Sequence, residues 1–179
     1  MNIFVFIMLK QFYLILISLT IIHLPLQALA KSHKQYCKVI YVTDGDSFKC
    51  LLMNKKKIRV RLQGIDAPEK SQPYGLQARK ALVTLINKQN ILLIIHGKDN
   101  YRRTLATAYK IKGSQKTNIN LTMVKLGFAW VYEHYNKKTR YLLAQQQAQK
   151  YRKGLWYSQE AISPYQWRTT HKKSYKDHK

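Results

Sequence analysis

The chain has 179 residues, the size of one ordinary domain. Its 32 lysines and arginines outnumber its 8 aspartates and glutamates, which gives a formal net charge of +24. This excess excludes an acidic calcium buffer and predicts a polyanionic partner, either nucleic acid or an anionic membrane surface. The hydrophobic fraction of 46% is enough for a folded core and excludes a disordered basic chain.

Residues 1–30 have the layout of a secretory signal peptide. One cation, Lys10, precedes an apolar run over residues 12–22, and Pro25 and a small-residue A-x-A pattern ending at Ala30 follow it. The run is shorter than the roughly 20 residues that a membrane-spanning helix needs. We therefore expect cleavage after Ala30, export to the periplasm or the medium, and no stable membrane insertion afterwards. An uncleaved N-terminal anchor is the alternative.

Three strands are predicted at the start of the segment that cleavage would leave. Residues 36–43 and 47–53 are rich in β-forming side chains and flank Asp44-Gly45, a dipeptide typical of hairpin turns. Residues 57–64 alternate apolar and basic side chains, the period-2 pattern of a half-buried strand. Together the three strands are predicted to form a meander.

Two cysteines, Cys37 and Cys50, flank the predicted hairpin turn. Export would permit a disulfide between them. Folding the chain at the turn brings the two flanks near enough for a bridge if a bulge adjusts the register. The alternative is that both are small buried apolar side chains.

The remaining elements are predicted in the order helix, two strands and two helices. The evidence is helical spacing of apolar residues, short apolar runs and glycines at the helix ends. These elements occupy residues 75–88, 91–96, 103–111, 119–128 and 138–153.

The order of elements predicts an α+β, mainly β fold: a five-stranded OB-fold barrel with about three helices, a common platform for oligonucleotides. We expect this domain to span residues 31–168, with the aromatic-rich segment 155–168 docked on its body. Residues 169–179 are expected to be a basic, disordered tail. Because nothing in the sequence indicates an oligomer, a monomer is predicted.

Half of the scarce acidic residues fall in two short clusters, made of Asp44, Asp46, Asp66 and Glu69. Their clustering indicates a function, although turn chemistry is the alternative. Asp46 starts the second strand and Asp66 ends the third, and the sequence permits, without showing, that the two carboxylates meet. Two carboxylates with backbone carbonyls and water would bind a hard cation. Pro68 fixes the chain just before Glu69.

Two arginines lie near these clusters in the sequence. Arg61 precedes the second cluster, and Arg103 lies on or before the fifth predicted strand. Guanidinium groups suit phosphate because they donate paired hydrogen bonds and keep their charge. A cation, two arginines and a free carboxylate are the groups that phosphodiester hydrolysis needs. For any single arginine in so basic a chain, a solvated or merely phosphate-binding residue is the alternative.

The sequence DGDS…RVRLQGIDAPE…YRRTLATAY…GLW resembles the thermonuclease (staphylococcal nuclease) family over about residues 36–157. The ending GLWYSQEAISPYQWR is similar to the tail of many exported bacterial members. The resemblance implies an OB-fold, calcium-dependent endonuclease that acts on DNA and RNA. By position, it implies that calcium is bound by Asp46, Asp66 and the backbone carbonyl of Ala67, and that Glu69 acts on the attacking water.

The resemblance also implies that Arg61 and Arg103 hold the scissile phosphate and that Tyr101 packs near the bound nucleotide. The family often has glycine where this chain has Arg102, which could alter the backbone before the fifth strand. Tyr132 and Tyr135 are both candidates for stacking on a nucleotide. The alternative is that these two tyrosines only cover the core.

Two other functions compete with a nuclease. A non-catalytic OB-fold nucleic-acid-binding protein needs only a basic groove and aromatic side chains. A basic cell-surface protein is less favoured, because the charge is spread through the domain rather than along one amphipathic helix. The complete set of candidate catalytic residues favours the nuclease.

Overall fold

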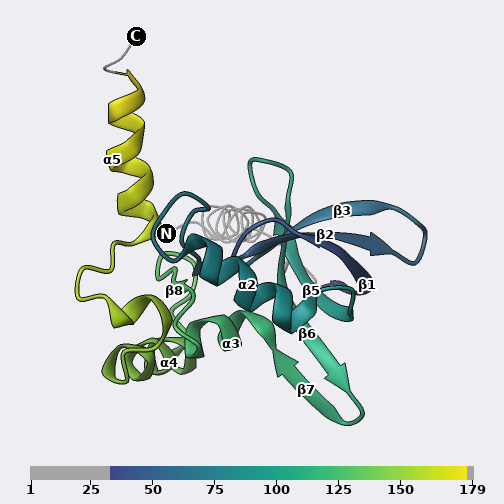
Figure 1. The fold of residues 1–179 in the computed structure, drawn as a ribbon. Helices are drawn as coiled ribbons and strands as arrows, with labels where there is room; N and C mark the ends of the chain where they lie inside the picture. The colour runs from purple at the N-terminus through teal and green to yellow at the C-terminus, as the bar shows by residue number, and fades with distance from the viewer. Residues whose placement is uncertain (1–32, 177–179) are drawn as a thin grey trace, which may run out of the picture. The chain divides into compact units, whose positions relative to one another are not determined.

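The computed structural model describes residues 33–176 (Figure 1). The predicted signal peptide over residues 1–30 lies outside this range, as do residues 177–179. Among the described residues, no helix is both long and apolar enough to cross a bilayer.

The described chain begins with the predicted meander of three antiparallel strands, β1 (His33–Val42), β2 (Ser47–Leu52) and β3 (Lys57–Leu62). In the register of β2 with β3, Ser47 lies opposite Arg61. The start of β2 therefore lies beside the end of β3. One acidic cluster directly precedes β2 and the other follows β3.

Two further strands close the barrel. Strand β5 (Asn90–Lys98) pairs antiparallel with β1 and with β6 (Thr104–Lys112), and β6 pairs in parallel with β3. Figure 1 shows the resulting ring of β3, β2, β1, β5 and β6. The predicted mainly β, five-stranded OB-fold barrel is confirmed.

Three short strands lie outside the barrel: β4 (Ile65–Asp66), β7 (Gln115–Asn118) and β8 (Trp130–Val131). Two-residue strands are too short to give a period-2 pattern, so the sequence does not predict them. The pairing of β4 with β8 places Asp66 opposite Trp130. This pairing brings the tyrosine-containing segment after β8 to the end of the barrel that carries Asp66.

Three helices form within the predicted ranges: α2 (Gly75–Ile86), α3 (Ile119–Lys125) and α4 (Thr139–Lys150). Helix α2 buries one face, including Leu82 and Ile86, in the core that also fills the barrel. The helical spacing of its apolar residues is the reason that the sequence predicts it.

A fourth α-helix of the described chain, α5 (Pro164–Lys176), follows the short helix η2 (Gly154–Tyr157). It continues past residue 168, so the structure differs from the disorder expected at the start of the tail. The Ser163 hydroxyl accepts the main-chain N–H of Gln166 (3.2 Å), and the Gln166 side chain accepts the main-chain N–H of Ser163 (3.2 Å). Serine, proline and glutamine at these positions form a capping box with proline in the first turn.

Asn120 joins helix α3 to the barrel at its closure. Its side chain is fully buried, accepts the N–H of Ala108 (2.9 Å), and donates to the carbonyls of Gln63 (2.9 Å) and Ala106 (3.1 Å). One amide therefore satisfies main-chain groups from β6 and from the residue after β3. A buried polar side chain with all these partners fixes how the two strands meet.

Cys37 and Cys50 are joined by a disulfide between β1 and β2, with a Cα–Cα distance of 5.7 Å. In the strand register, Cys50 lies opposite Val39, two residues from Cys37 on the same face. The register shifts between Val39 and Tyr41, so a bulge accompanies the disulfide-linked hairpin.

Gly45 brings the turn before β2 against the loop that follows β4. A Cβ at this position would lie 2.7 Å from the Cβ atoms of both Ala67 and Ala78. Only glycine permits so close an approach. The turn over residues 44–46 therefore packs against the segment that contains Asp66.

Candidate active site

A cleft of about 730 Å³ opens at this end of the barrel. All the residues that the sequence assigned to catalysis, substrate binding or metal binding line it: Asp46, Arg61, Asp66, Ala67, Glu69, Tyr101, Arg103, Tyr132 and Tyr135. Their convergence is a property of the fold, since they come from the turn before β2, from β3, from β4 and the loop after it, from the turn before β6 and from the segment after β8.

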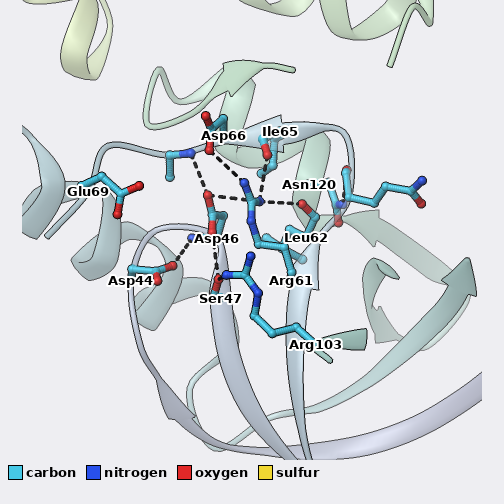
Figure 2. A network of polar contacts seen from close by, with 12 residues as sticks. Asp44, Asp46, Ser47, Arg61, Leu62, Ile65, Asp66, Glu69, Arg103 and Asn120 are labelled. Carbon is cyan, nitrogen blue, oxygen red and sulfur yellow. Dashed lines mark hydrogen bonds and ion pairs between the residues drawn. The ribbon is translucent and has the colours of Figure 1, made fainter. Parts of the chain in front are cut away.

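Arg61 stands between the two candidate metal-binding carboxylates (Figure 2). Its Nη1 lies 3.1 Å from Oδ2 of Asp46, and its Nη2 lies 2.8 Å from Oδ1 of Asp66. Nη1 also donates to the carbonyls of Leu62 (2.9 Å) and Ile65 (2.8 Å). These main-chain contacts hold the guanidinium in place, and the side chains of Asp46 and Asp66 are only 7% and 6% exposed.

Asp46 is oriented by hydrogen bonds with neighbouring residues. Its Oδ2 accepts the main-chain N–H of Ala67 (2.8 Å), and its Oδ1 accepts the hydroxyl of Ser47 (2.9 Å). Its own main-chain N–H donates to Oδ1 of Asp44 (3.0 Å). Asp44 therefore shapes the turn that presents Asp46.

The carboxylates of this cluster are crowded, which makes ionisation costly. Burial, with the Asp46 carboxylate adding to it, raises the pKa of Asp44 to about 7. Burial also raises the pKa of Asp66, although the hydrogen bond from Arg168 opposes this shift. Buried, closely spaced carboxylates favour a bound cation, because its charge offsets both their repulsion and their loss of hydration.

The donor chemistry of the cluster fits a hard divalent cation. Asp46, Asp66 and the carbonyl of Ala67 offer oxygen ligands, which calcium prefers. Within residues 33–176 no three His, Cys, Asp or Glu side chains gather as a metal-binding group. The candidate ligands of a cation held here are the carboxylates of Asp46 and Asp66 and the carbonyl oxygen of Ala67.

Asp99 anchors the second arginine. Its Oδ2 accepts Nε of Arg103 (2.6 Å), and its Oδ1 accepts the main-chain N–H groups of Tyr101 (3.0 Å) and Arg103 (2.8 Å). Burial alone would raise the pKa of Asp99, but the hydrogen bonds from Arg103 outweigh it and hold this pKa below its usual value. Nη1 of Arg103 reaches the Ser47 hydroxyl (3.3 Å), which places the guanidinium beside Asp46, as Figure 2 shows.

Arg102 occupies the left-handed backbone region, with φ at 60°. This is the position where the resembled family often has glycine, and glycine adopts this conformation without strain. The chain keeps the same kind of turn with an arginine. Its main-chain N–H donates to the carbonyl of Asp99 (2.9 Å), and the loop remains closed around Arg103.

Aromatic side chains form the rim of the cleft. Tyr101 is 71% exposed, and its ring centroid lies 5.5 Å from Cζ of Arg103. Tyr132 and Tyr135 pack edge to face at 5.0 Å, and Tyr135 is 62% exposed. Exposed rings beside arginines offer surfaces on which bases can stack. Both Tyr132 and Tyr135 remain candidates for that role.

Arg168 is a residue of the cleft that the sequence analysis did not single out. Its Nη1 lies 2.7 Å from Oε1 of Glu69, and its Nη2 lies 2.9 Å from Oδ2 of Asp66. The sequence signal that could have identified Arg168 is the Trp-Arg ending, which is part of the family resemblance. For Asp99, also missed, the signal was the rarity of acids in a chain that has only eight.

The fold and the site together define a class: an OB-fold protein whose cleft combines paired carboxylates with arginines that suit phosphate. The family model described as staphylococcal nuclease homologue matches residues 59–158. An uncharacterized endonuclease of Haemophilus influenzae is 45% identical over 159 residues, which cover 89% of this chain and 86% of that protein. A micrococcal nuclease of Shigella flexneri is 38% identical over 142 residues, which cover 75% of this chain and 81% of that protein.

The chain belongs to the staphylococcal nuclease family. The matched segment contains Arg61, Asp66, Glu69 and Arg103, while Asp46 precedes it. Family membership and the nuclease names of the relatives support a nuclease, which is a hydrolase with nucleic acid as its substrate.

Proposed function

We propose that the protein is an exported, calcium-dependent endonuclease that hydrolyses phosphodiester bonds in DNA and RNA. The observation that carries the proposal is the shared cleft, where Arg61 bridges the buried carboxylates of Asp46 and Asp66. Glu69 and Arg103 line the same cleft. A cleft with only basic and aromatic side chains would serve binding alone.

In this proposal, Asp46, Asp66 and the Ala67 carbonyl hold calcium, which supplies positive charge at the phosphate when it is bound. Arg61 and Arg103 bind the non-bridging oxygens of the phosphate and stabilise the charge that develops on them. The anchoring of both guanidinium groups supports this role, because a fixed donor needs no reorganisation during the reaction.

Glu69 is proposed to orient the attacking water and accept its proton at a carboxylate oxygen. The Glu69 side chain is 41% exposed, whereas that of Asp66 is 6% exposed. A half-exposed carboxylate at the edge of the cleft has access to water that the buried pair lacks. This difference in environment supports separate roles for the two acids.

The substrate and its location follow from charge and sequence. The net charge of +24 and the exposed tyrosines support binding along a polyanionic strand. Export to the periplasm or the medium rests on the signal-peptide pattern of residues 1–30. We propose that the exported protein acts as a monomer without stable membrane insertion.

A cleavage assay tests the proposal. The protein and a Glu69→Gln variant are incubated with single-stranded DNA, double-stranded DNA and RNA, in calcium or in chelator. Glu160→Gln is the matched control, because Glu160 is exposed and lies outside the cleft. We expect calcium-dependent cleavage that Glu69→Gln slows by about 100- to 10,000-fold and that Glu160→Gln leaves unchanged.

Tight, salt-sensitive binding without cleavage in any metal would refute the proposal. It would support the alternative, a non-catalytic OB-fold nucleic-acid-binding protein.

A further inference from the structure

We propose that Arg168, on helix α5, is a positioning residue of the active site that holds the carboxylate of Glu69 toward the buried carboxylate of Asp66. The inference rests on the proposed function, since it assigns Arg168 a role through the proposed catalytic Glu69. In this proposal, helix α5 contributes to catalysis because it supplies the residue that positions Glu69.

The first observation is the geometry of the guanidinium. Nη1 donates to Oε1 of Glu69 at 2.7 Å, and Nη2 donates to Oδ2 of Asp66 at 2.9 Å. A guanidinium is planar and its nitrogens have a fixed spacing, so one group bound to two carboxylates sets the distance between them. Arg168 therefore links residues that lie 99 and 102 positions earlier in the chain.

The second observation is a separate link between the same loop and the segment that leads into α5. Gln72 is buried, and its Oε1 accepts the main-chain N–H of Glu69 (3.1 Å). Its Nε2 donates to the carbonyl of Ile162 (2.7 Å). The backbone of Glu69 is thus tied through Gln72 to the start of the C-terminal segment, while its side chain is tied through Arg168 to the helix.

The backbone of the loop that carries Glu69 is held tightly, but the Glu69 side chain is not. A Cβ at Gly75 would overlap the carbonyl oxygen of Glu69, so the loop packs directly on the first turn of α2. By contrast, the Glu69 side chain is 41% exposed, and Arg168 contributes its ion pair. Removing Arg168 should leave the backbone in place and release the carboxylate.

The expected effect is on the chemical step. Misplacing a catalytic group by about 1 Å can cost about 100-fold in rate. We expect Arg168→Ala to lower kcat by about 10- to 100-fold while KM changes by less than about 3-fold, because Arg61 and Arg103 still hold the phosphate. An arginine that bound substrate phosphate itself would instead raise KM.

The experiment measures kcat and KM for calcium-dependent cleavage by the wild-type protein and by Arg168→Ala, Arg168→Lys and Glu69→Gln. Arg140→Ala is the control, since it removes an exposed arginine of α4 that lies outside the cleft. Thermal unfolding of each variant checks that it folds. Guanidinium salt is then added to test for recovery of the missing group.

Three results together would support the positioning role. Arg168→Ala loses kcat and regains part of it with guanidinium, Arg168→Lys is intermediate, and the double variant Arg168→Ala/Glu69→Gln is no slower than Glu69→Gln alone. The last result follows because a residue that acts only through Glu69 has nothing left to position.

Other outcomes separate the inference from the proposed function. If the wild-type protein cleaves and Glu69→Gln is far slower, but Arg168→Ala matches Arg140→Ala, the positioning role is wrong and the nuclease stands. A rise in KM with kcat unchanged would also overturn it and make Arg168 a substrate-binding residue. If the wild-type protein does not cleave at all, the proposed function fails and the inference fails with it.

Discussion

Replacing Arg102 with glycine is expected to stabilise the protein. Arg102 has a φ of 60° in the turn between Asp99 and Arg103, and its side chain is exposed. A side chain with a Cβ crowds the following carbonyl in this left-handed conformation. Glycine lacks that Cβ and leaves the hydrogen bond from residue 102 to the Asp99 carbonyl unchanged.

The magnitude is a difference between two opposing effects. The left-handed conformation costs a residue with a Cβ about 1–2 kcal/mol. Glycine loses more backbone freedom on folding, which costs about 0.5–1 kcal/mol relative to alanine. The free energy of unfolding should therefore rise by about 0.5–1 kcal/mol, which for a domain of this size raises Tm by about 1–4 °C.

Differential scanning calorimetry of the wild-type protein and of the Arg102→Gly and Arg102→Ala variants checks this prediction. Arg102→Ala removes the charged side chain and keeps the crowded backbone, so it separates charge relief from backbone relief. We expect Tm to rise for glycine and to stay close to wild type for alanine. Equal stabilisation by both variants, or a lower Tm for Arg102→Gly, would refute the argument from backbone strain.

Two further predictions concern stability. Burial raises the pKa of Asp44 to about 7 from 3.8, so the stability contributed by its neutral form is complete below pH 3.8 and is lost as pH rises through 7. Above pH 7, the free energy of unfolding of Asp44→Asn should therefore exceed that of the wild-type protein by on the order of 1–2 kcal/mol, after discounting for partial exposure. This difference should shrink toward pH 4. Urea unfolding of both proteins in chelator at several pH values measures it. The Cys37–Cys50 disulfide closes a loop with a sequence separation of 13, so its reduction, or a Cys37→Ser/Cys50→Ser variant, should lower the free energy of unfolding by about 3 kcal/mol. Unchanged urea midpoints on adding reductant would contradict that value.

The sequence could predict the barrel because each barrel strand has a local signal. Residues 57–64 alternate in polarity, and the glycine after Asp44 marks the turn between the first two strands. Strands β4 and β8, with two residues each, carry no such pattern and form only because the folded barrel brings them together. Their pairing is a tertiary effect that no local window contains.

Helix α5 had a sequence signal that the composition concealed. Ser163, Pro164 and Gln166 form a capping box with proline in the first turn, yet the segment is basic and has no long apolar stripe. Trp167 and His171, one turn apart, stack with ring centroids 3.6 Å apart. The capping box predicts where the helix begins. Without an apolar stripe, the sequence does not predict how far the helix continues.

The meeting of Asp46 and Asp66 follows from strand register, which composition does not supply. Ser47 lies opposite Arg61, so the residues just before β2 and just after β3 share one end of the barrel. Gly45 then allows the turn to contact Ala67 at a distance that any Cβ would forbid. The clustering of the few carboxylates predicted the site from the sequence. The antiparallel pairing of β2 with β3 and the close packing at Gly45 bring those carboxylates together.

The position of Arg168 shows what kind of information the sequence lacked. Asp46 and Ala67 are 21 positions apart with Arg61 and Asp66 between them, and short connections place these residues at one end of the barrel. Arg168 reaches Asp66 across 102 residues, from a helix that follows a segment hydrogen-bonded to Gln72 through the Ile162 carbonyl. Long-range contacts of this kind depend on the whole fold, so the sequence contains the Trp-Arg ending but does not predict which residues Arg168 contacts.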